Sequence, residues 1–199
     1  MAIASVQDRY QTPGECRFMM PIPESHPLRR WMTGLVENTF HAEVGLCEPA
    51  VLDYIAEMLT EFIHVERINL VGDGSHRSVE DLAELLGQAE ARIGMSDERR
   101  RELYRHVGDY TLFWTGVYPE NLKRMHRRHS KDDLLDYFEQ GKRSYAIASE
   151  LSDDATVPPA LVLRSLSDQF EYCVYGLGLV RRNWEHPSSS GDPPPTILH

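Results

Sequence analysis

The sequence has few cysteines and lacks the long apolar runs of membrane spans. Only 3 of its 199 residues are Cys, and Cys16, Cys47 and Cys173 form no pair at CxxC spacing. A disulfide framework and a cysteine-based zinc site therefore have no support. No stretch approaches the ~18 continuous apolar residues of a membrane span, and the first residues lack the apolar core of a signal peptide. We expect a cytoplasmic protein with reduced thiols and no membrane partner.

Several motifs of common catalytic and nucleotide-binding sites are also missing. The Gly72-Asp73-Gly74 turn does not belong to a GxxxxGK[ST] phosphate-binding loop, and no GxSxG motif marks a serine nucleophile. Nucleotide binding and serine-based hydrolysis therefore receive no support.

Positive charge is scarce relative to negative charge. Lys and Arg total 21 against 31 Asp and Glu, which gives a formal net charge of -10. The field of such a surface repels nucleic acid and anionic membranes, so we expect neither as a general partner. Hydrophobic residues at 41% and charged residues at 26% are typical of a globular protein.

Apolar residues recur at three- and four-residue spacing, and no segment shows the alternation of a half-buried strand. We predict an all-α, single-domain bundle of about five to seven helices over 25–186. An irregular arm over 1–24 precedes it, and a disordered tail rich in Pro and Ser over 187–199 follows it. Ser25 and Ser96 are expected N-caps. The expected helices cover 25–44, 49–63, 78–93, 96–118, 130–148 and 158–184.

One helix carries an unusual polar stripe. Glu102, His106 and Asp109 lie at i, i+4 and i+7, and the residues from Asp109 to Tyr118 are apolar around the whole helix. A helix turn that is apolar on every side is buried on every side, so Asp109 must enter the core. A buried carboxylate needs a partner or a shifted pKa. Asp109 therefore either bonds a Tyr, an Arg or a helix-end amide, or has a catalytic or metal-binding role.

Two runs in the sequence resemble an uncharacterised family of bacterial proteins. Its "GD-xx-LF-xx-G-xx-PE" run matches Gly108-Asp109, Leu112-Phe113, Gly116 and Pro119-Glu120, and its "YF-xx-G-xx-SY-xx-A" run matches the segment from Tyr137 to Ala148. The resemblance implies an all-helical domain with a shared structural centre, and it implies no activity.

From the glycines in these runs we further expect that the two runs pack together. Gly108, Gly116 and Gly141 allow helices to approach closely. Asp109, Glu120 and Tyr145 are then candidate polar contacts.

A metal site is conceivable, because Glu61-Phe62-Ile63-His64 is a Glu-x-x-His motif. A ferritin-like di-iron centre needs two such motifs, and the second is missing. At 100° per residue, Glu61 and His64 lie roughly 130° and 170° from the apolar stripe of their helix and should face water. Glu102 with His106, and Glu37 with His41, add weak candidates at i, i+4 spacing. A haem near His106 is a further alternative, but we predict no metal and no cofactor.

A basic segment stands out against the negative net charge. It supplies candidate anion-binding residues at Lys123, Arg124, Arg127, Arg128 and Lys131. It either binds a phosphate, an acidic partner or RNA, or it neutralises the acidic residues nearby. A second basic cluster, Arg99–Arg101 with Arg105, would strengthen an anion site if the two clusters converge.

These patterns leave three functional hypotheses. The first is a helical binding or interaction protein without catalytic activity, which binds a protein partner or a second copy of itself. The second is a metal- or cofactor-dependent enzyme with a site near Glu102, His106 and Asp109, in which His106, Asp109 and Tyr145 are the candidate catalytic residues. The third is anion or nucleic-acid binding through the 123–131 segment.

Overall fold

The structure is a computed structural model that describes residues 22–23, 25–71, 95–120, 133–153 and 156–186, without the side chains of 64–71 and 133–136. In this part of the chain all regular elements are helical, and no strand occurs. The all-α prediction is therefore confirmed. The arm, the tail and the expected helix over 78–93 lie outside the described residues, apart from 22 and 23.

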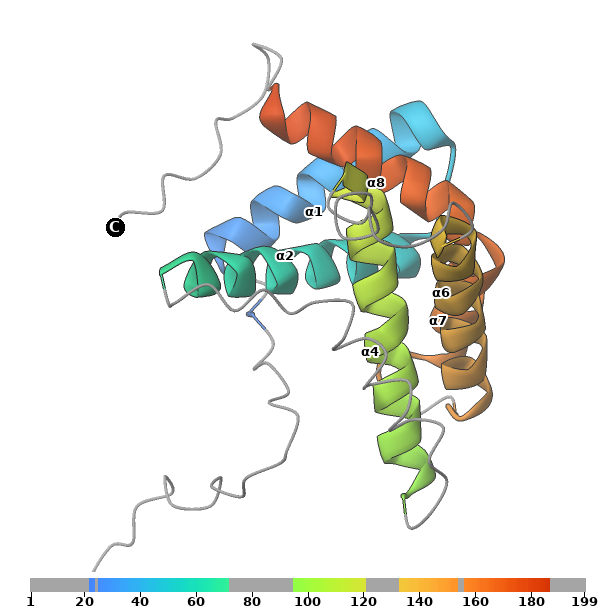
Figure 1. The fold of residues 1–199 in the computed structure, drawn as a ribbon. Coiled ribbons are helices and arrows are strands. Elements are labelled where there is room, and N and C mark those ends of the chain that lie inside the picture. Colours follow the sequence, from blue (N-terminus) through green and yellow to red (C-terminus); the bar gives the residue numbers. More distant parts are fainter. Residues whose placement is uncertain (1–21, 24, 72–94, 121–132, 154–155, 187–199) are drawn as a thin grey trace, which may run out of the picture.

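Six α-helices and one π-helical turn make up the described fold (Figure 1). In chain order they are α1 (Pro27–Thr39), η2 (Phe40–Val44), α2 (Pro49–Val71), α4 (Asp97–Gly116), α6 (Asp133–Glu150), α7 (Ala160–Asp168) and α8 (Phe170–Glu185).

The helices form two groups that meet at α4. α6 packs along α4 and is covered on its other side by α7, whereas α1 packs against α2 and α8. α8 also contacts α4, so α4 belongs to both groups. Figure 1 shows α1, α2 and α8 running across the upper part of α4. Within the described residues, no helix has the length and apolarity needed to cross a membrane.

Local capping signals explain where two helices begin. The Oγ of Ser96 accepts a hydrogen bond from the Arg99 amide at 3.3 Å, as its position predicted. The prediction of Ser25 as the first cap was wrong. His26 is the N-cap of α1, because its Nδ1 accepts from the Leu28 amide at 3.2 Å, and Pro27 follows as the first residue of the helix.

The expected helix over 158–184 is two helices. It breaks at Gln169, whose φ of -112° and ψ of 23° are not helical. The break lets α7 pack mainly on α6 while α8 turns toward α4 and α1, which a straight helix could not do. Gln169 itself donates from its side chain to Glu48 Oε1 at 2.7 Å.

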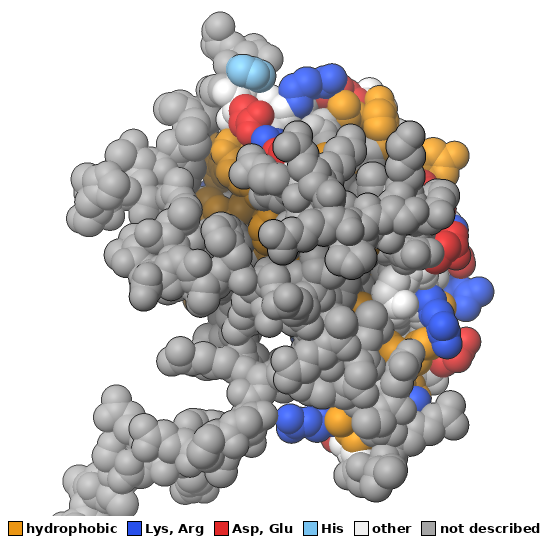
Figure 2. All heavy atoms as spheres, viewed as in Figure 1, with side chains coloured by type: hydrophobic (Ala, Val, Ile, Leu, Met, Phe, Trp, Pro, Cys, Tyr) orange, Lys and Arg blue, Asp and Glu red, His pale blue; other side chains and the backbone are white. Residues whose placement is uncertain are grey.

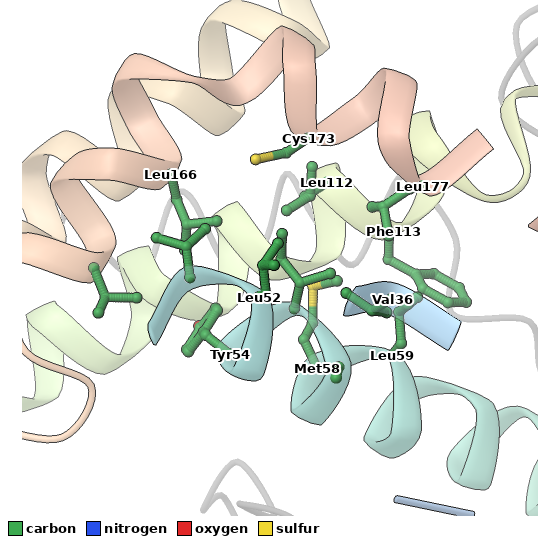
Figure 3. Packing of buried hydrophobic residues seen from close by; sticks show 14 of the residues in the cluster. Val36, Leu52, Tyr54, Met58, Leu59, Leu112, Phe113, Leu166, Cys173 and Leu177 are labelled. Carbon is green, nitrogen blue, oxygen red and sulfur yellow. The ribbon is translucent and has the colours of Figure 1, made fainter. Parts of the chain in front are cut away.

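The core lies where the two groups of helices meet. Figure 3 shows side chains from α2 (Leu52, Met58, Leu59), from α4 (Leu112, Phe113) and from α8 (Cys173, Leu177) gathering between these helices. All of them belong to one cluster of buried apolar residues. Asp109 lies on α4 within this buried stretch, as the apolar surroundings of its helix predicted.

Candidate functional site

Asp109 is a buried carboxylate that receives hydrogen bonds from two tyrosines on two other helices. The residue is 4% exposed. Its Oδ1 accepts from the hydroxyl of Tyr54 on α2 at 2.5 Å and from that of Tyr145 on α6 at 2.8 Å. One carboxylate oxygen on α4 thus connects α2, α4 and α6.

The second carboxylate oxygen of Asp109 is bound by an arginine from its own helix. Arg105 Nη1 lies 3.2 Å from Asp109 Oδ2 and 3.5 Å from the Tyr54 hydroxyl. The same guanidinium binds Glu102 Oε2 through Nη2 at 2.9 Å and through Nε at 3.1 Å. The sequence reading in which Asp109 bonds a Tyr or an Arg is confirmed, since it bonds both.

The electrostatics of this cluster keep its protons on the donors. Burial raises the pKa of Tyr54 and of Tyr145 well above the usual value, and the neighbouring charge of Asp109 raises both further. Burial lowers the pKa of Arg105, but Tyr54, Asp109 and Glu102 outweigh this effect and hold it above its ordinary value. Both tyrosines are therefore hydrogen-bond donors over the physiological pH range, and Arg105 stays charged.

Two glycines permit the close helix packing around these bonds, Gly108 between α4 and α6 and Gly141 between α6 and its neighbours on α8 and α4. A Cβ on Gly108 would lie 2.8 Å from ring atoms of Tyr145. A Cβ on Gly141 would lie 2.4 Å from Phe170 and 3.1 Å from Thr111. Such distances are shorter than real carbon contacts, so only glycine fits without movement. The prediction that the two runs pack together, with Asp109 and Tyr145 in contact, is confirmed.

The C-terminal end of α4 packs against α8 and not against α6. Gly116 approaches α8, where its Cβ would meet Leu177 at 2.6 Å. Glu120 was expected to join the contact between the two runs, but the ion pair described for it is made with α8. It binds Arg181 of α8 at 2.6 Å, and Arg181 also donates to the Val117 carbonyl at 2.6 Å. Glu120 therefore fastens α8 to the end of α4.

The basic cluster on α4 is largely used within the fold. Arg101 is buried, is paired with Glu102, and donates to Ser152 Oγ and to the Val157 carbonyl, both at 2.8 Å. Arg100 pairs with Asp97 at 3.1 Å. Of this cluster, Arg99 alone is exposed without an ion pair among the described residues. These arginines fix α4 to its surroundings and do not form an open anion site.

The metal-binding candidates whose side chains the structure describes do not converge. Among the residues described, no group of three or more His, Cys, Asp and Glu side chains has a metal-binding arrangement. His106 is half-buried and stacks on Phe62, with ring centroids 6.4 Å apart and planes 16° apart. Glu37 and His41 are exposed on α1 and η2, and the His64 side chain lies outside the described residues.

The structure corrects the prediction for Glu61. The helical wheel placed it toward water, but its side chain is half-buried. Burial, with a smaller contribution from the neighbouring Glu57, raises its pKa to about 7. The wheel failed because it measures the angle to the apolar stripe of α2, whereas α4 covers part of the polar side.

Arg29 is a second buried charge that the sequence reasoning missed. It is 4% exposed, and its guanidinium binds the Asp53 carbonyl at 3.0 Å and the Asp53 carboxylate at 2.8 Å. The sequence contained one signal of this burial, because Arg29 follows Leu28 on the apolar side of α1.

The remaining candidates give little further chemistry. Lys123, Arg124, Arg127, Arg128 and Lys131 lie outside the described residues, as does Cys16. Cys47 is exposed, and Cys173 is buried in the core, as expected, with burial raising its pKa to about 12. A thiol held protonated in this way is not a nucleophile.

The arrangement around Asp109 is thus closed. Both of its oxygens are occupied by donors from the same chain, and the hydroxyls of Tyr54 and Tyr145 are turned toward it. No family model matches the chain, and neither a curated protein nor a solved structure matches it.

Proposed function

We propose that this protein is a non-catalytic helical interaction protein and that its partner is a second copy of the same chain. The contact surface in this proposal is the outer side of α8, which carries Tyr172 and Tyr175, hereafter the tyrosine face. These two side chains are 63% and 58% exposed. They are three residues apart on one helix and so share a side of it.

The closed state of the Asp109 cluster supports the absence of catalysis. A general acid, base or metal ligand needs an atom that can reach a substrate or ion. Asp109 has both oxygens bound, and the Tyr145 hydroxyl is buried and bonded to it. The cluster therefore has the properties of a structural centre.

The exposed tyrosines are the observation that carries the proposal. Tyrosine is enriched at protein interfaces because it offers a large apolar area with few rotatable bonds. Among the side chains that the structure describes, four large hydrophobic ones are exposed: Tyr172 and Tyr175, together with Val157 and Leu161. Figure 2 shows hydrophobic side chains beside acidic and basic ones along the upper right edge, where Figure 1 places η2 and the beginning of α8.

The charges around the tyrosine face favour a second copy as the partner. Two chains with a net charge of -10 each repel one another, so they meet at lowest cost where the local charge is balanced. The charged residues of α8 on this side are paired with cations or anions of the same chain. Glu171 binds Lys142 at 2.8 Å, and Arg182 binds Glu43 at 2.8 Å. A symmetric contact of α8 with α8 places such balanced surfaces together.

Sedimentation velocity over a concentration series tests this proposal. We expect the wild-type chain to form a dimer and the double variant Y172S/Y175S to dissociate at least about tenfold more easily. The control is V157S/L161S, which removes apolar groups that are even more exposed, 86% and 76%, from α7 and the turn before it and should leave the dimer intact. Added salt should strengthen the dimer by screening the repulsion between the two chains.

A wild-type chain that stays monomeric at every concentration contradicts the proposal. Equal weakening of the dimer by both double variants also contradicts the proposal, because the tyrosine face would then have no special role.

The metal-dependent alternative is tested separately, by elemental analysis and an absorption spectrum of protein purified without chelator. Stoichiometric metal or a visible chromophore would favour it. For the basic segment, salt-sensitive retention on heparin would support anion binding.

A further inference from the structure

The two ends of the tyrosine face present opposite charges to the solvent. Near the N-terminal end of α8, Glu171 is 55% exposed and its partner Lys142 only 31%, so the carboxylate is the outer member of this ion pair. Near the C-terminal end, Arg182 is 59% exposed and its partner Glu43 only 35%, so the guanidinium is the outer member. A surface that packs against α8 therefore meets a negative group at one end and a positive group at the other.

The middle of the same face contains a glycine that the fold of one chain does not require. Gly178 is exposed and lies three residues after Tyr175. A Cβ at this position would lie 3.6 Å from the carbonyl oxygen of Gly116, which is an ordinary contact. A glycine within a helix costs about 1 kcal/mol relative to alanine. The packing of α8 on α4 gives no reason for this cost, in contrast to the packing at Gly108 and Gly141.

The charges distinguish between the two ways in which a twofold axis can pair α8 with α8 of a second copy. In a parallel pair, Glu171 meets Glu171 and Arg182 meets Arg182, so like charges lie together. In an antiparallel pair centred on Tyr175, Glu171 lies about 6 Å before the centre and Arg182 about 10 Å after it, at ~1.5 Å per residue. Glu171 of one copy then lies within one turn of Arg182 of the other, and opposite charges meet.

The sizes of the side chains favour the same antiparallel arrangement. Tyr172 lies three residues before Tyr175, and Gly178 lies three residues after it. Tyr172 of one copy is therefore at the level of Gly178 of the other, where the facing helix has no side chain to hinder the ring. In a parallel pair the tyrosines would meet each other and the glycines would leave a gap, which close packing disfavours.

We propose that two copies of this chain associate through antiparallel α8 helices centred on Tyr175. Glu171 and Arg182 set the direction of the contact, and Gly178 is the residue that admits the tyrosine ring of the second copy. This inference rests on the proposed function, because it gives the orientation and the specificity-determining residues of the same tyrosine face.

Charge reversal in the full chain tests the direction of the contact. We expect R182E and E171R each to weaken the dimer at least about tenfold in sedimentation velocity, because each variant places like charges together at both ends of the contact. An equimolar mixture of the two variants restores opposite charges at both ends, so it should form a heterodimer as tight as the wild-type dimer. The matched controls R99E and E98R make the same changes of net charge in the first turn of α4, at the end far from α8 (Figure 1), and should differ little from wild type.

Gly178→Phe tests the match of sizes. Its Cβ fits the folded chain, so urea unfolding at concentrations where the chain is monomeric should show no loss of stability, whereas the dimer should weaken at least about tenfold. A wild-type chain that is monomeric at every concentration would remove the proposed function and this inference together. A wild-type dimer that R182E and E171R leave unchanged would overturn the antiparallel contact alone, and so would a dimer that is as tight in G178F as in wild type.

Discussion

The Tyr145 hydroxyl lies 2.8 Å from Asp109 Oδ1, and the ring of Tyr145 lies against Gly108, the residue before Asp109 on α4. The close approach and the hydrogen bond depend on each other. Without a glycine at 108 the ring would be pushed away, and without the hydroxyl the buried carboxylate would lose one of its donors. This pair therefore fixes how α4 and α6 pack.

The two tyrosine hydroxyls can be removed separately. We expect Tyr145→Phe and Tyr54→Phe each to lower the free energy of unfolding by about 1–2 kcal/mol, because each removes one donor from a buried carboxylate. Their effects should not be additive, since both hydroxyls bind the same oxygen. Urea unfolding of the single and double variants measures this.

Tyr172→Phe, on the exposed side of α8, is the control for the loss of a hydroxyl and should leave the stability unchanged. If Tyr145→Phe behaves like this control, its bond to Asp109 contributes nothing to stability.

Replacing a glycine by alanine should lower the stability where helices pack closely and raise it where the glycine has open surroundings. Gly108→Ala and Gly141→Ala should each lower the stability by about 1–3 kcal/mol, because the new methyl group meets a ring at 2.8 Å or closer. Gly34→Ala on α1 meets nothing within 4 Å and should raise it by about 0.5–1 kcal/mol, since alanine is the better helix former. Thermal unfolding of the three variants compares these effects directly. Equal shifts at all three positions would mean that helix propensity, and not packing, decides.

Much of the fold and the centre of the site could be predicted from local patterns. The apolar surroundings from Asp109 to Tyr118 predicted a buried carboxylate, and the glycines at 108 and 141 predicted a close helix pair. Each of these signals is local, because it is carried by residues within one helix. Ser96 is a similar case, since an N-cap acts within one turn.

What could not be predicted depends on contacts between distant segments. The break at Gln169 has no glycine or proline to mark it, and the apolar stripe continues through it. The half-burial of Glu61 results from α4, which is far away in the sequence. Arg29 is buried because Asp53 of α2 lies opposite it. Tertiary packing decides these features.

We infer that Asp109 is a structural centre of an interaction protein. Urea unfolding of Asp109→Asn, with sedimentation velocity on the same sample, tests it most directly. Asparagine keeps the shape but removes the charge that binds Arg105, so we predict a loss of about 3 kcal/mol or more in unfolding free energy. The folded variant should still form the dimer as tightly as wild type. Unchanged stability, or a stable variant that no longer associates, would contradict the claim.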